Sequence, residues 1–385
     1  MRICMAAPYD VTDAKSWSGT PRSVYQTLRA IPQNQVTALD LSAFHTPGAI
    51  RRSRLQYLAP IASLKAHAAV SRLGTAYMNP LNSSILRAHC SRAEYDVLLE
   101  FGGFMPSADL PPYYIYTDSS HDLSLDFYEQ TGRLPYNYRA EDLDDVRRAA
   151  AHCRAIYQNA QGVFCMSRWL ADTMIRRTQV DEKNVHVVYA GANWHGERPD
   201  KNMQPRALRT DGEIRLLLVG VSYGGKGVDL ALDALDILNA ARDGTRYSLH
   251  VCGLREEFPN REGVTQHGFI SKQMLRQLLQ TCDLFVLPSR FDCFGIAFVE
   301  AMTYGLPCVG RNLCAMPEII GEGVSGELVG SDDPAELAEK IRRICGSAET
   351  YARYSAAALE KSKQFTWEKT TQEMMRIFRQ DGIMA

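Results

Sequence analysis

The chain has 385 residues, of which 45% are hydrophobic and 23% charged, a composition typical of a globular protein too long for one core, which predicts two domains. Its formal net charge of −1 argues against nucleic acid as a partner, and no apolar run approaches the roughly 20 residues that cross a bilayer. The ten cysteines show no CxxC spacing, which argues against disulfides or a zinc site and predicts a cytoplasmic location.

Short β-rich runs alternate with helical runs along the first half of the chain. The opening residues MRICMAAPYD enter a strand directly and lack the pattern of a signal peptide. Strands are predicted at 2–6, 35–39, 95–100, 113–117, 162–166 and 185–189, and helices at 20–30, 138–159 and 168–176.

A basic segment lies between the second and third predicted strands. It has no Asp or Glu from 41 to 93, and apolar residues such as Ile85 and Leu86 separate its cations, which are Arg51, Arg52, Arg54, Lys65, Arg72, Arg87 and Arg92. Two interpretations stay open: a solvated helix face, or peripheral contact with an anionic membrane through 51–92, at the inner face of the cell membrane.

The pattern restarts after a polar stretch at 193–210, which is predicted to be a linker. Strands are predicted at 214–220, 247–252, 284–288 and 307–310, and helices at 227–240, 271–280, 295–304 and 334–345. Such alternation predicts an α/β protein with two Rossmann-like domains. Because open parallel sheets bind ligands at the carboxyl ends of their strands, we expect the site in a central cleft between the domains.

The most informative segment is DLFVLPSRFDCFGIAFVEAMTYGLPCV, residues 283–309. A buried strand is followed by a short loop and by a helix that starts near Gly295. The backbone N–H groups of its first turn, at 294–297, suit a diphosphate. Glu300 lies among apolar neighbours on this helix, so its carboxylate needs a partner, and ribose hydroxyls would serve.

Two further loops contain glycine directly after a predicted strand. In VGVSYGGKGVDLALDAL, residues 219–235, a Gly-rich turn precedes Lys226, and such turns bind phosphates. In SWSGTPRSV, residues 16–24, Gly19 opens the first helix. The alternative interpretations are a solvent-facing lysine and an ordinary turn glycine.

Segment 283–309 resembles the signature of the retaining GT-B glycosyltransferases of family 4, the glycosyl transferases group 1. In that family two Glu residues eight positions apart flank a Phe-Gly, the first contacting the sugar and the second the ribose. Here Glu300 matches the second position, whereas Asp292, one methylene shorter, stands at the first. The resemblance implies that Lys226 stabilises the leaving diphosphate. Val221 and Ser222 replace the family's usual Arg, for which Arg290 is a candidate substitute.

The resemblance extends to the whole architecture. It implies an acceptor-binding domain over 1–195, a last helix at 366–385 that crosses back to it, and a nucleotide-sugar-binding domain over 211–365. The family's His near the sugar and acceptor is matched by His121 or Asp118. The implied catalytic residues are Lys226, Asp292, His121 and Asp118, and the implied donor-binding residues are Gly19, Gly225, Lys226, Asp292, Phe294, Gly295, Ile296, Ala297 and Glu300.

The implied reaction is retaining transfer of a hexose from a UDP- or GDP-sugar to a glycan or lipid-linked acceptor, without a metal or cofactor, in polysaccharide, lipopolysaccharide or glycolipid assembly. Two alternatives stay open: a nucleotide-sugar epimerase of the same fold, and a non-catalytic binding protein, given Asp292 and the missing Arg. A nicotinamide-dependent dehydrogenase is disfavoured because no GxGxxG with a following acid is present.

Overall fold

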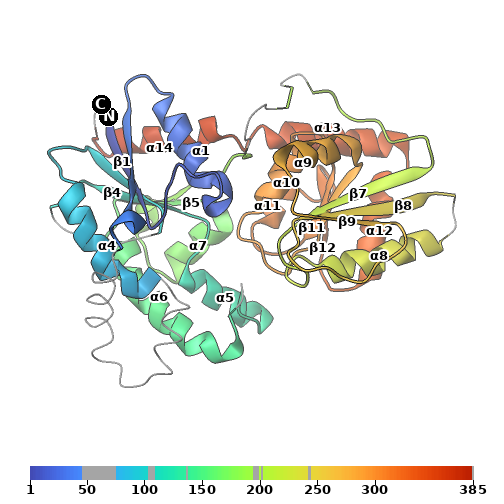
Figure 1. The fold of residues 1–385 in the computed structure, drawn as a ribbon, viewed down its shortest axis with the longest axis horizontal. Helices are drawn as coiled ribbons and strands as arrows, with labels where there is room; N and C mark the ends of the chain where they lie inside the picture. The colour runs from blue at the N-terminus through green and yellow to red at the C-terminus, as the bar shows by residue number, and fades with distance from the viewer. Residues whose placement is uncertain are drawn as a thin grey trace. The chain divides into compact units, whose positions relative to one another are not determined.

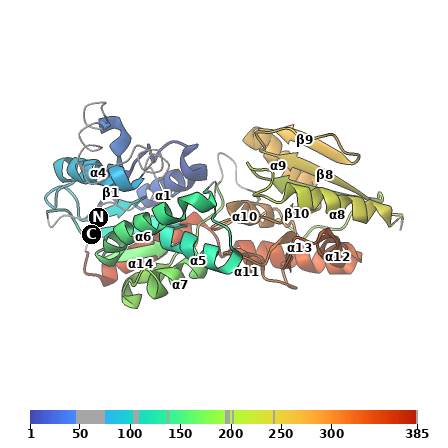
Figure 2. The same cartoon turned by 90° about the horizontal axis from the view of Figure 1, so that it is seen from below.

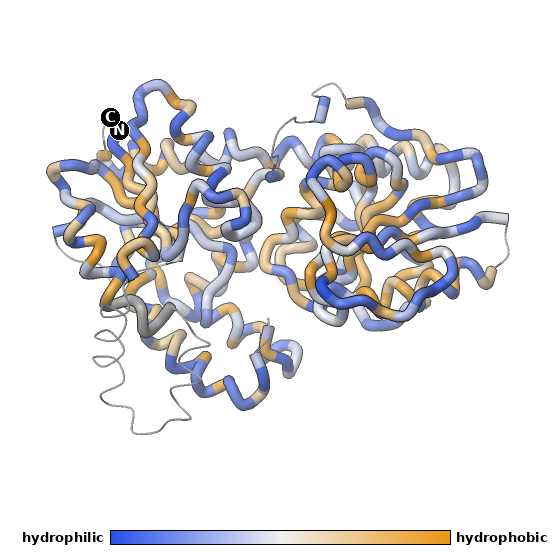
Figure 3. Tube along the Cα trace, in the orientation of Figure 1, coloured by the Kyte–Doolittle hydropathy of each residue, from blue (hydrophilic) through white to orange (hydrophobic). Residues whose placement is uncertain are grey.

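The structure is a computed structural model that describes residues 1–45, 75–102, 109–135, 138–193, 199–200, 203–241 and 244–383. The chain divides into two compact units, Met1–Ala190 with Trp367–Ala385, and Gly191–Thr366. Figure 1 shows a sheet with surrounding helices in each. In both units the hydrophobic residues concentrate along the strands at the centre (Figure 3).

The first unit contains a parallel six-stranded sheet of order β2-β1-β3-β4-β5-β6. Residues of β3, β4 and β5 are buried throughout, as expected for strands covered on both faces. The strands are β1 (Arg2–Ala7), β2 (Gln35–Asp40), β3 (Val97–Glu100), β4 (Tyr113–Thr117), β5 (Gly162–Cys165) and β6 (Val185–Val187).

Helices of the first unit cover this sheet: α1 (Thr20–Arg29), α4 (Thr75–His89), α5 (His121–Thr131), α6 (Leu143–Gln158), α7 (Arg168–Arg176) and α14 (Trp367–Gln380). Helix α5 was not predicted; it begins after Ser120, whose hydroxyl accepts from the backbone N–H of Leu123. Helix α6 begins later than predicted, because Ala140–Asp142 forms a 3₁₀ turn. Among the described residues, no helix has the length and apolar composition that a membrane span requires.

Residues 46–74, which hold most of the basic segment, lie outside the described part of the chain. Ile85 and Leu86 lie on α4, and their side chains are buried in the core of the first unit. Contact with a membrane would require these two apolar side chains to face outward. Ile85 and Leu86 therefore do not fit that interpretation. The packing of α4 against the unit's own core explains them instead.

The second unit contains another parallel sheet, of order β12-β11-β10-β7-β8-β9. Its strands are β7 (Glu213–Val219), β8 (Arg246–Cys252), β9 (Val264–Gly268), β10 (Leu284–Leu287), β11 (Cys308–Arg311) and β12 (Gly326–Val329). Its helices are α8 (Val228–Ala240), α9 (Lys272–Thr281), α10 (Ile296–Met302), α11 (Met316–Ile320), α12 (Pro334–Cys345) and α13 (Ala348–Ser362). The sequence did not predict β9, β12, α11 or α13.

The predicted linker at 193–210 includes described residues that pack on the second unit. The backbone N–H of Arg206 donates to the Ser355 hydroxyl at 2.8 Å, and its guanidinium donates to the carbonyls of Leu279 and Gln280. The second unit, Gly191–Thr366, accordingly includes the polar stretch that was predicted to be a linker.

Helix α14 returns the end of the chain to the first unit, where it lies beside α1 (Figures 1 and 2). The Phe378 ring packs against Tyr114 of β4 and Phe164 of β5, with ring centroids 4.6 and 5.7 Å apart. The Tyr114 hydroxyl donates to Asp381 at 2.6 Å. The last helix is therefore part of the first unit's core.

This packing predicts that Phe378→Ala destabilises the first unit. The ring is fully buried, so its removal should lower the free energy of unfolding by about 3–5 kcal/mol. The neighbouring Arg379 is exposed. The control variant Arg379→Ala should therefore change the free energy of unfolding by less than about 0.5 kcal/mol. Chemical denaturation of both variants measures the difference, and equal stabilities would contradict the assigned packing.

Candidate functional site

Two loops of the second unit meet because β7 and β10 are adjacent parallel strands, paired at Leu216 and Leu284. The chain leaves both strands at the same edge of the sheet. Lys226, seven residues after the end of β7, places its Nζ 2.6 Å from Oδ2 of Asp292, which follows β10. The exposed fractions of the two side chains are 21% and 19%. Two of the predicted site residues thus form a partly buried ion pair.

Asp292 also holds the start of α10, since its Oδ1 accepts from the backbone N–H of Gly295 at 2.9 Å. Gly295 has a φ of 76°, a conformation that glycine adopts without strain. One of the N–H groups predicted to receive a diphosphate is therefore bound by the protein's own carboxylate. The Phe294 side chain is buried in the unit, where its ring packs against Phe365. Ile296 and Ala297 are partly buried.

The glycine after Lys226 is required by its surroundings. Gly227 has a φ of 68° and starts α8. A Cβ at this position would lie 2.4 Å from the carbonyl oxygen of Pro288. The two loops can thus approach each other closely because Gly227 has no side chain. The backbone N–H of Arg290 donates to the carbonyl of Gly225 at 3.0 Å and joins the loops a second time.

Arg290 braces the loop that carries Lys226. Its guanidinium donates to both carboxylate oxygens of Asp229 at 2.8 and 2.7 Å, to the Gly224 carbonyl at 2.6 Å, and to Asp332 at 3.2 Å. Val221, which stands where the family's usual Arg is expected, is 59% exposed. Because two carboxylates already hold Arg290, we infer that it positions the loop rather than replacing the missing Arg.

Glu300 is buried on α10, with 9% of its surface exposed. Its carboxylate accepts from the backbone N–H of Asn193, and burial raises its pKa above the ordinary value, while Lys272 and the Asn193 N–H oppose that shift. The burial expected from its apolar neighbours is confirmed, and a ribose as its partner stays a prediction. The partner in the structure is a backbone group of the predicted linker, which the sequence pattern did not indicate.

The predicted residues of the first unit lie where its strands end. Gly19, with a φ of 85°, precedes α1. Asp118 follows β4 and accepts from Nε1 of Trp17 at 3.3 Å. His121 is the first residue of α5, and burial lowers its pKa below the ordinary value. Trp17, which sequence reasoning missed, lies two residues before Gly19; an aromatic residue in a glycine loop was the available signal.

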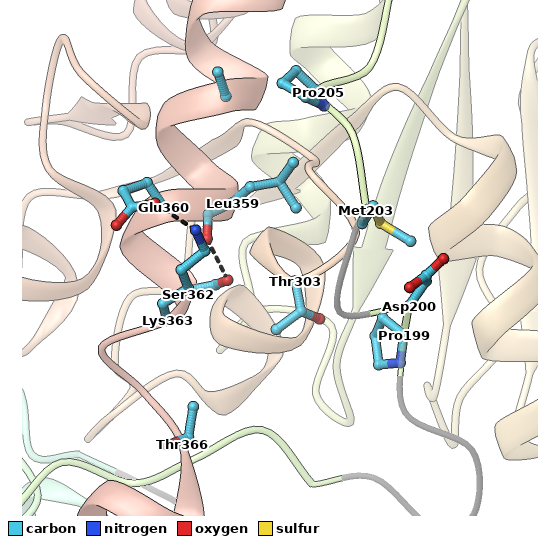
Figure 4. Close-up of a pocket in the computed structure, with 11 residues that line it drawn as sticks. Pro199, Asp200, Met203, Pro205, Thr303, Leu359, Glu360, Ser362, Lys363 and Thr366 are labelled. Carbon is cyan, nitrogen blue, oxygen red and sulfur yellow. Dashed lines mark hydrogen bonds and ion pairs between the residues drawn. The ribbon is translucent and has the colours of Figure 1, made fainter.

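Two cavities of the second unit do not coincide with the predicted residues. A cavity of about 520 Å³ lies between the polar stretch and α13, where Lys363 pairs with Glu360 and Thr303 closes one side (Figure 4). A second, of about 600 Å³, lies beyond β8 and β9 and includes Glu256, which accepts from the N–H of Tyr223. Within the described ranges, no three His, Cys, Asp or Glu side chains group to hold a metal ion.

The contact between Gly227 and Pro288 predicts that Gly227→Ala disrupts the paired loops. Strain at a positive φ and the overlap with the Pro288 carbonyl should together cost about 2–4 kcal/mol of stability. Gly224→Ala is the matched control, because a Cβ there has no atom within 4 Å and should cost less than about 0.5 kcal/mol. Thermal denaturation compares them, and an unaffected Gly227→Ala protein would show that the close approach is not required.

The buried carboxyl of Glu300 predicts a pH-dependent stability. Because its folded-state pKa is raised, the folded chain is most favoured when the carboxyl is protonated, and that stability is lost as pH rises through the folded-state pKa. Glu300→Gln removes this loss, so at neutral pH it should be more stable than the parent chain, by about 1.4 kcal/mol for each unit of pKa shift.

The control for this measurement is Glu349→Gln, at an exposed position on α13. Free energies of unfolding from pH 4 to 8 give the comparison. Parallel pH profiles for Glu300→Gln and the parent chain would contradict the desolvation of Glu300.

Comparison with known proteins gives a consistent result. Residues 200–361 match the family model described as glycosyl transferases group 1. A relative, an uncharacterised glycosyltransferase of Methanocaldococcus jannaschii, is 24% identical over 233 residues, 58% of this chain and 60% of that protein. The chain spans about half the length of the curated relatives it matches.

Solved structures resemble the chain over nearly its whole length. Sucrose-phosphate synthase of Thermosynechococcus elongatus has a TM-score of 0.67 at 18% identity and covers 99% of this chain and 98% of that one. Anabaena HepE, in complex with UDP and glucose, has a TM-score of 0.61 at 16% identity, with 98% and 99% covered. The carboxyl-terminal unit of this protein is therefore similar to the glycosyl transferases group 1 family, and the chain as a whole has the GT-B fold.

Proposed function

We propose that this protein is a glycosyltransferase that moves a hexose from a nucleoside diphosphate sugar to an acceptor hydroxyl. The observation that carries the proposal is the pairing of Lys226 with Asp292 after β7 and β10, with buried Glu300 on the following helix α10, in a domain similar to this family. A cation with a nearby carboxylate suits a substrate that joins a diphosphate to a hydroxyl-rich ring.

The donor contacts divide among these residues. Lys226 binds the diphosphate, and the ion pair with Asp292 keeps its ammonium in the loop before a ligand arrives. Glu300 accepts hydrogen bonds from the ribose, and Asp292 accepts from the sugar. Because Asp292 also holds the Gly295 N–H, its reach toward the sugar is limited, and we propose that this position sets the donor's sugar preference. A UDP-sugar is the first donor to test, since HepE, of the same fold, is in complex with UDP and glucose.

The chemistry requires stabilisation of a leaving group. As the acceptor oxygen bonds to the anomeric carbon, the bond from that carbon to the diphosphate oxygen breaks, and its electron pair goes to the diphosphate. Lys226 offsets the negative charge that develops there. The acceptor's proton moves to the leaving phosphate on the same face, which retains the anomeric configuration. We propose that no metal takes part, because Lys226 supplies the positive charge, and activity in excess chelator tests this.

The acceptor and the cellular context extend the proposal. The first unit would bind a glycan or lipid-linked acceptor, with Asp118 and His121 near the reacting hydroxyl and Gly19 in the loop before α1. A role in polysaccharide or lipopolysaccharide assembly, in the cytoplasm and with peripheral contact to an anionic membrane, rests on the basic segment 51–92. An epimerase and a non-catalytic binding protein are the alternatives that product analysis separates.

The proposal predicts that one variant loses nucleotide affinity and that another loses catalytic rate. Glu300→Ala removes a charge-assisted hydrogen bond of about 1.5–3 kcal/mol, so UDP or GDP should bind roughly 10- to 150-fold more weakly. Lys226→Ala should slow release of nucleoside diphosphate by about 100- to 1,000-fold. Calorimetric titration with UDP and GDP, and a coupled assay of UDP or GDP release from the corresponding nucleotide sugars, measure the two effects.

Glu349→Ala, on an exposed site of α13, should match the parent chain in both assays. Undiminished nucleotide binding by the Glu300→Ala protein would overturn the assignment of the donor site. If the parent chain binds nucleotide but releases none from any donor, the non-catalytic alternative is favoured.

A further inference from the structure

The loop before α1 has an unusual backbone. Three consecutive residues are left-handed: Trp17 with φ 44° and ψ 53°, Ser18 with φ 57° and ψ 18°, and Gly19 with φ 85°. Left-handed geometry costs a residue with a Cβ roughly 1–2 kcal/mol. Such strain persists only where the surrounding structure enforces it, and it concentrates at sites that bind or react. The contacts of Trp17 therefore need a functional explanation.

Trp17 lies where three neighbouring strands end. Its ring centroid is 6.1 Å from that of Phe101, which follows β3, and 6.3 Å from that of Tyr116 on β4. Phe101 and Tyr116 are buried and pack edge to face, with centroids 5.9 Å apart. The Tyr116 hydroxyl is enclosed and has no hydrogen-bond partner among the described residues. Because β1, β3 and β4 are adjacent and parallel, these rings gather at the sheet's carboxyl edge.

The indole of Trp17 also orients a carboxylate. Nε1 donates to Oδ2 of Asp118 at 3.3 Å, and both side chains are only partly buried. Tyr9 is partly buried as well, and its pKa is raised by burial and by the Asp118 charge. An aromatic surface thus lies beside a hydrogen-bond acceptor that the same aromatic residue holds in place.

We propose that Trp17 and Asp118 form a subsite for a neutral sugar ring of the acceptor, which names the acceptor class of the proposed transferase and rests on that function. The indole packs on the apolar C–H face of the ring, while the Asp118 carboxylate accepts from its hydroxyls. Trp17 stacks on the sugar and positions Asp118. The strained loop holds the Trp17 side chain in this place.

The chemistry of this pair excludes other acceptor groups at the same place. An acyl chain carries no hydroxyl for Asp118, so its carboxylate would lose water without compensation. A phosphate would be repelled by the carboxylate. Of these three groups, an uncharged sugar is the one that suits the position next to Trp17, even if the rest of the acceptor carries a lipid or a phosphate.

Three variants test the subsite. Trp17→Phe keeps an aromatic ring and removes the N–H that holds Asp118. Trp17→Gly removes the ring but adopts a φ of 44° freely, so the loop backbone should be preserved. Asp118→Asn removes the charge. Phe44→Ala is the control, since Phe44 is an aromatic residue of the same unit, 37% exposed, whose ring packs on His89.

The probes are UDP and GDP for the donor site, and immobilised glycans ending in neutral hexose or N-acetylhexosamine for the subsite, applied with saturating UDP. We expect Trp17→Gly to bind the preferred glycan at least about 10-fold more weakly, with Trp17→Phe and Asp118→Asn between it and the parent chain. The three variants, the Phe44→Ala control and the parent chain should all bind UDP or GDP equally.

The outcomes separate this inference from the proposed function. If the parent chain binds none of the neutral glycans, if Trp17→Gly binds them as the parent does, or if glycans ending in a phosphorylated sugar bind better than neutral ones, the subsite is overturned. Failure of the parent chain to bind any nucleotide contradicts the donor site instead. An equal loss in Phe44→Ala would attribute the effect to the unit's stability and overturn the specific role of Trp17.

Discussion

The parallel pairing of β7 with β10 is the constraint on which the proposed donor site depends. Lys226 and Asp292 are 66 residues apart in the chain, and they meet because these two strands end at the same edge of one sheet. The loops then approach so closely that Gly227 faces the Pro288 carbonyl. Pairing of strands buried in the unit's core thus fixes the place of a partly exposed ion pair.

The two cations of the paired loops, Arg290 and Lys226, differ in how firmly carboxylates hold them. Arg290 is bound by Asp229 and Asp332 and by a loop carbonyl, and it acts as a brace. Lys226 is held by Asp292, whose other oxygen holds the start of α10. A lysine is a flexible point charge, so in the proposed function a diphosphate takes the place of its carboxylate partner, whereas the guanidinium of Arg290 keeps its several bonds.

Each unit contains a feature that lowers its stability: a buried carboxyl in the second unit and a strained backbone in the first. In the second unit, the buried carboxyl of Glu300 is unfavourable for folding when ionised, which raises its pKa. In the first unit, Trp17 and Ser18 adopt a left-handed backbone beside Asp118. Both features lower stability without serving the hydrophobic core. They lie next to polar groups that suit hydroxyl-rich ligands, as expected where function rather than stability selects the local geometry.

Sequence alone determined the fold class and most of the strands, and it supplied the motif on which the proposed donor site rests. Strands such as β4 and β10 are continuous apolar runs bounded by Pro, Gly or Asp, and a helix such as α7 follows a capping Ser167, so their local patterns were sufficient. Less regular elements escaped detection. Strand β9 is only partly buried, with no alternation of apolar residues, and α5 begins in a polar run that resembles a loop.

Only the tertiary structure decided which side chains meet. The Lys226–Asp292 pair, the brace at Arg290, and the Asn193 partner of Glu300 join residues that are far apart in sequence, and Trp17 reaches Asp118 across 101 positions. The burial of Ile85 and Leu86 likewise follows from packing rather than from their charged neighbours. Local periodicity reports which face of an element is apolar, but contacts between loops depend on strand order, and strand order is a property of the folded sheet.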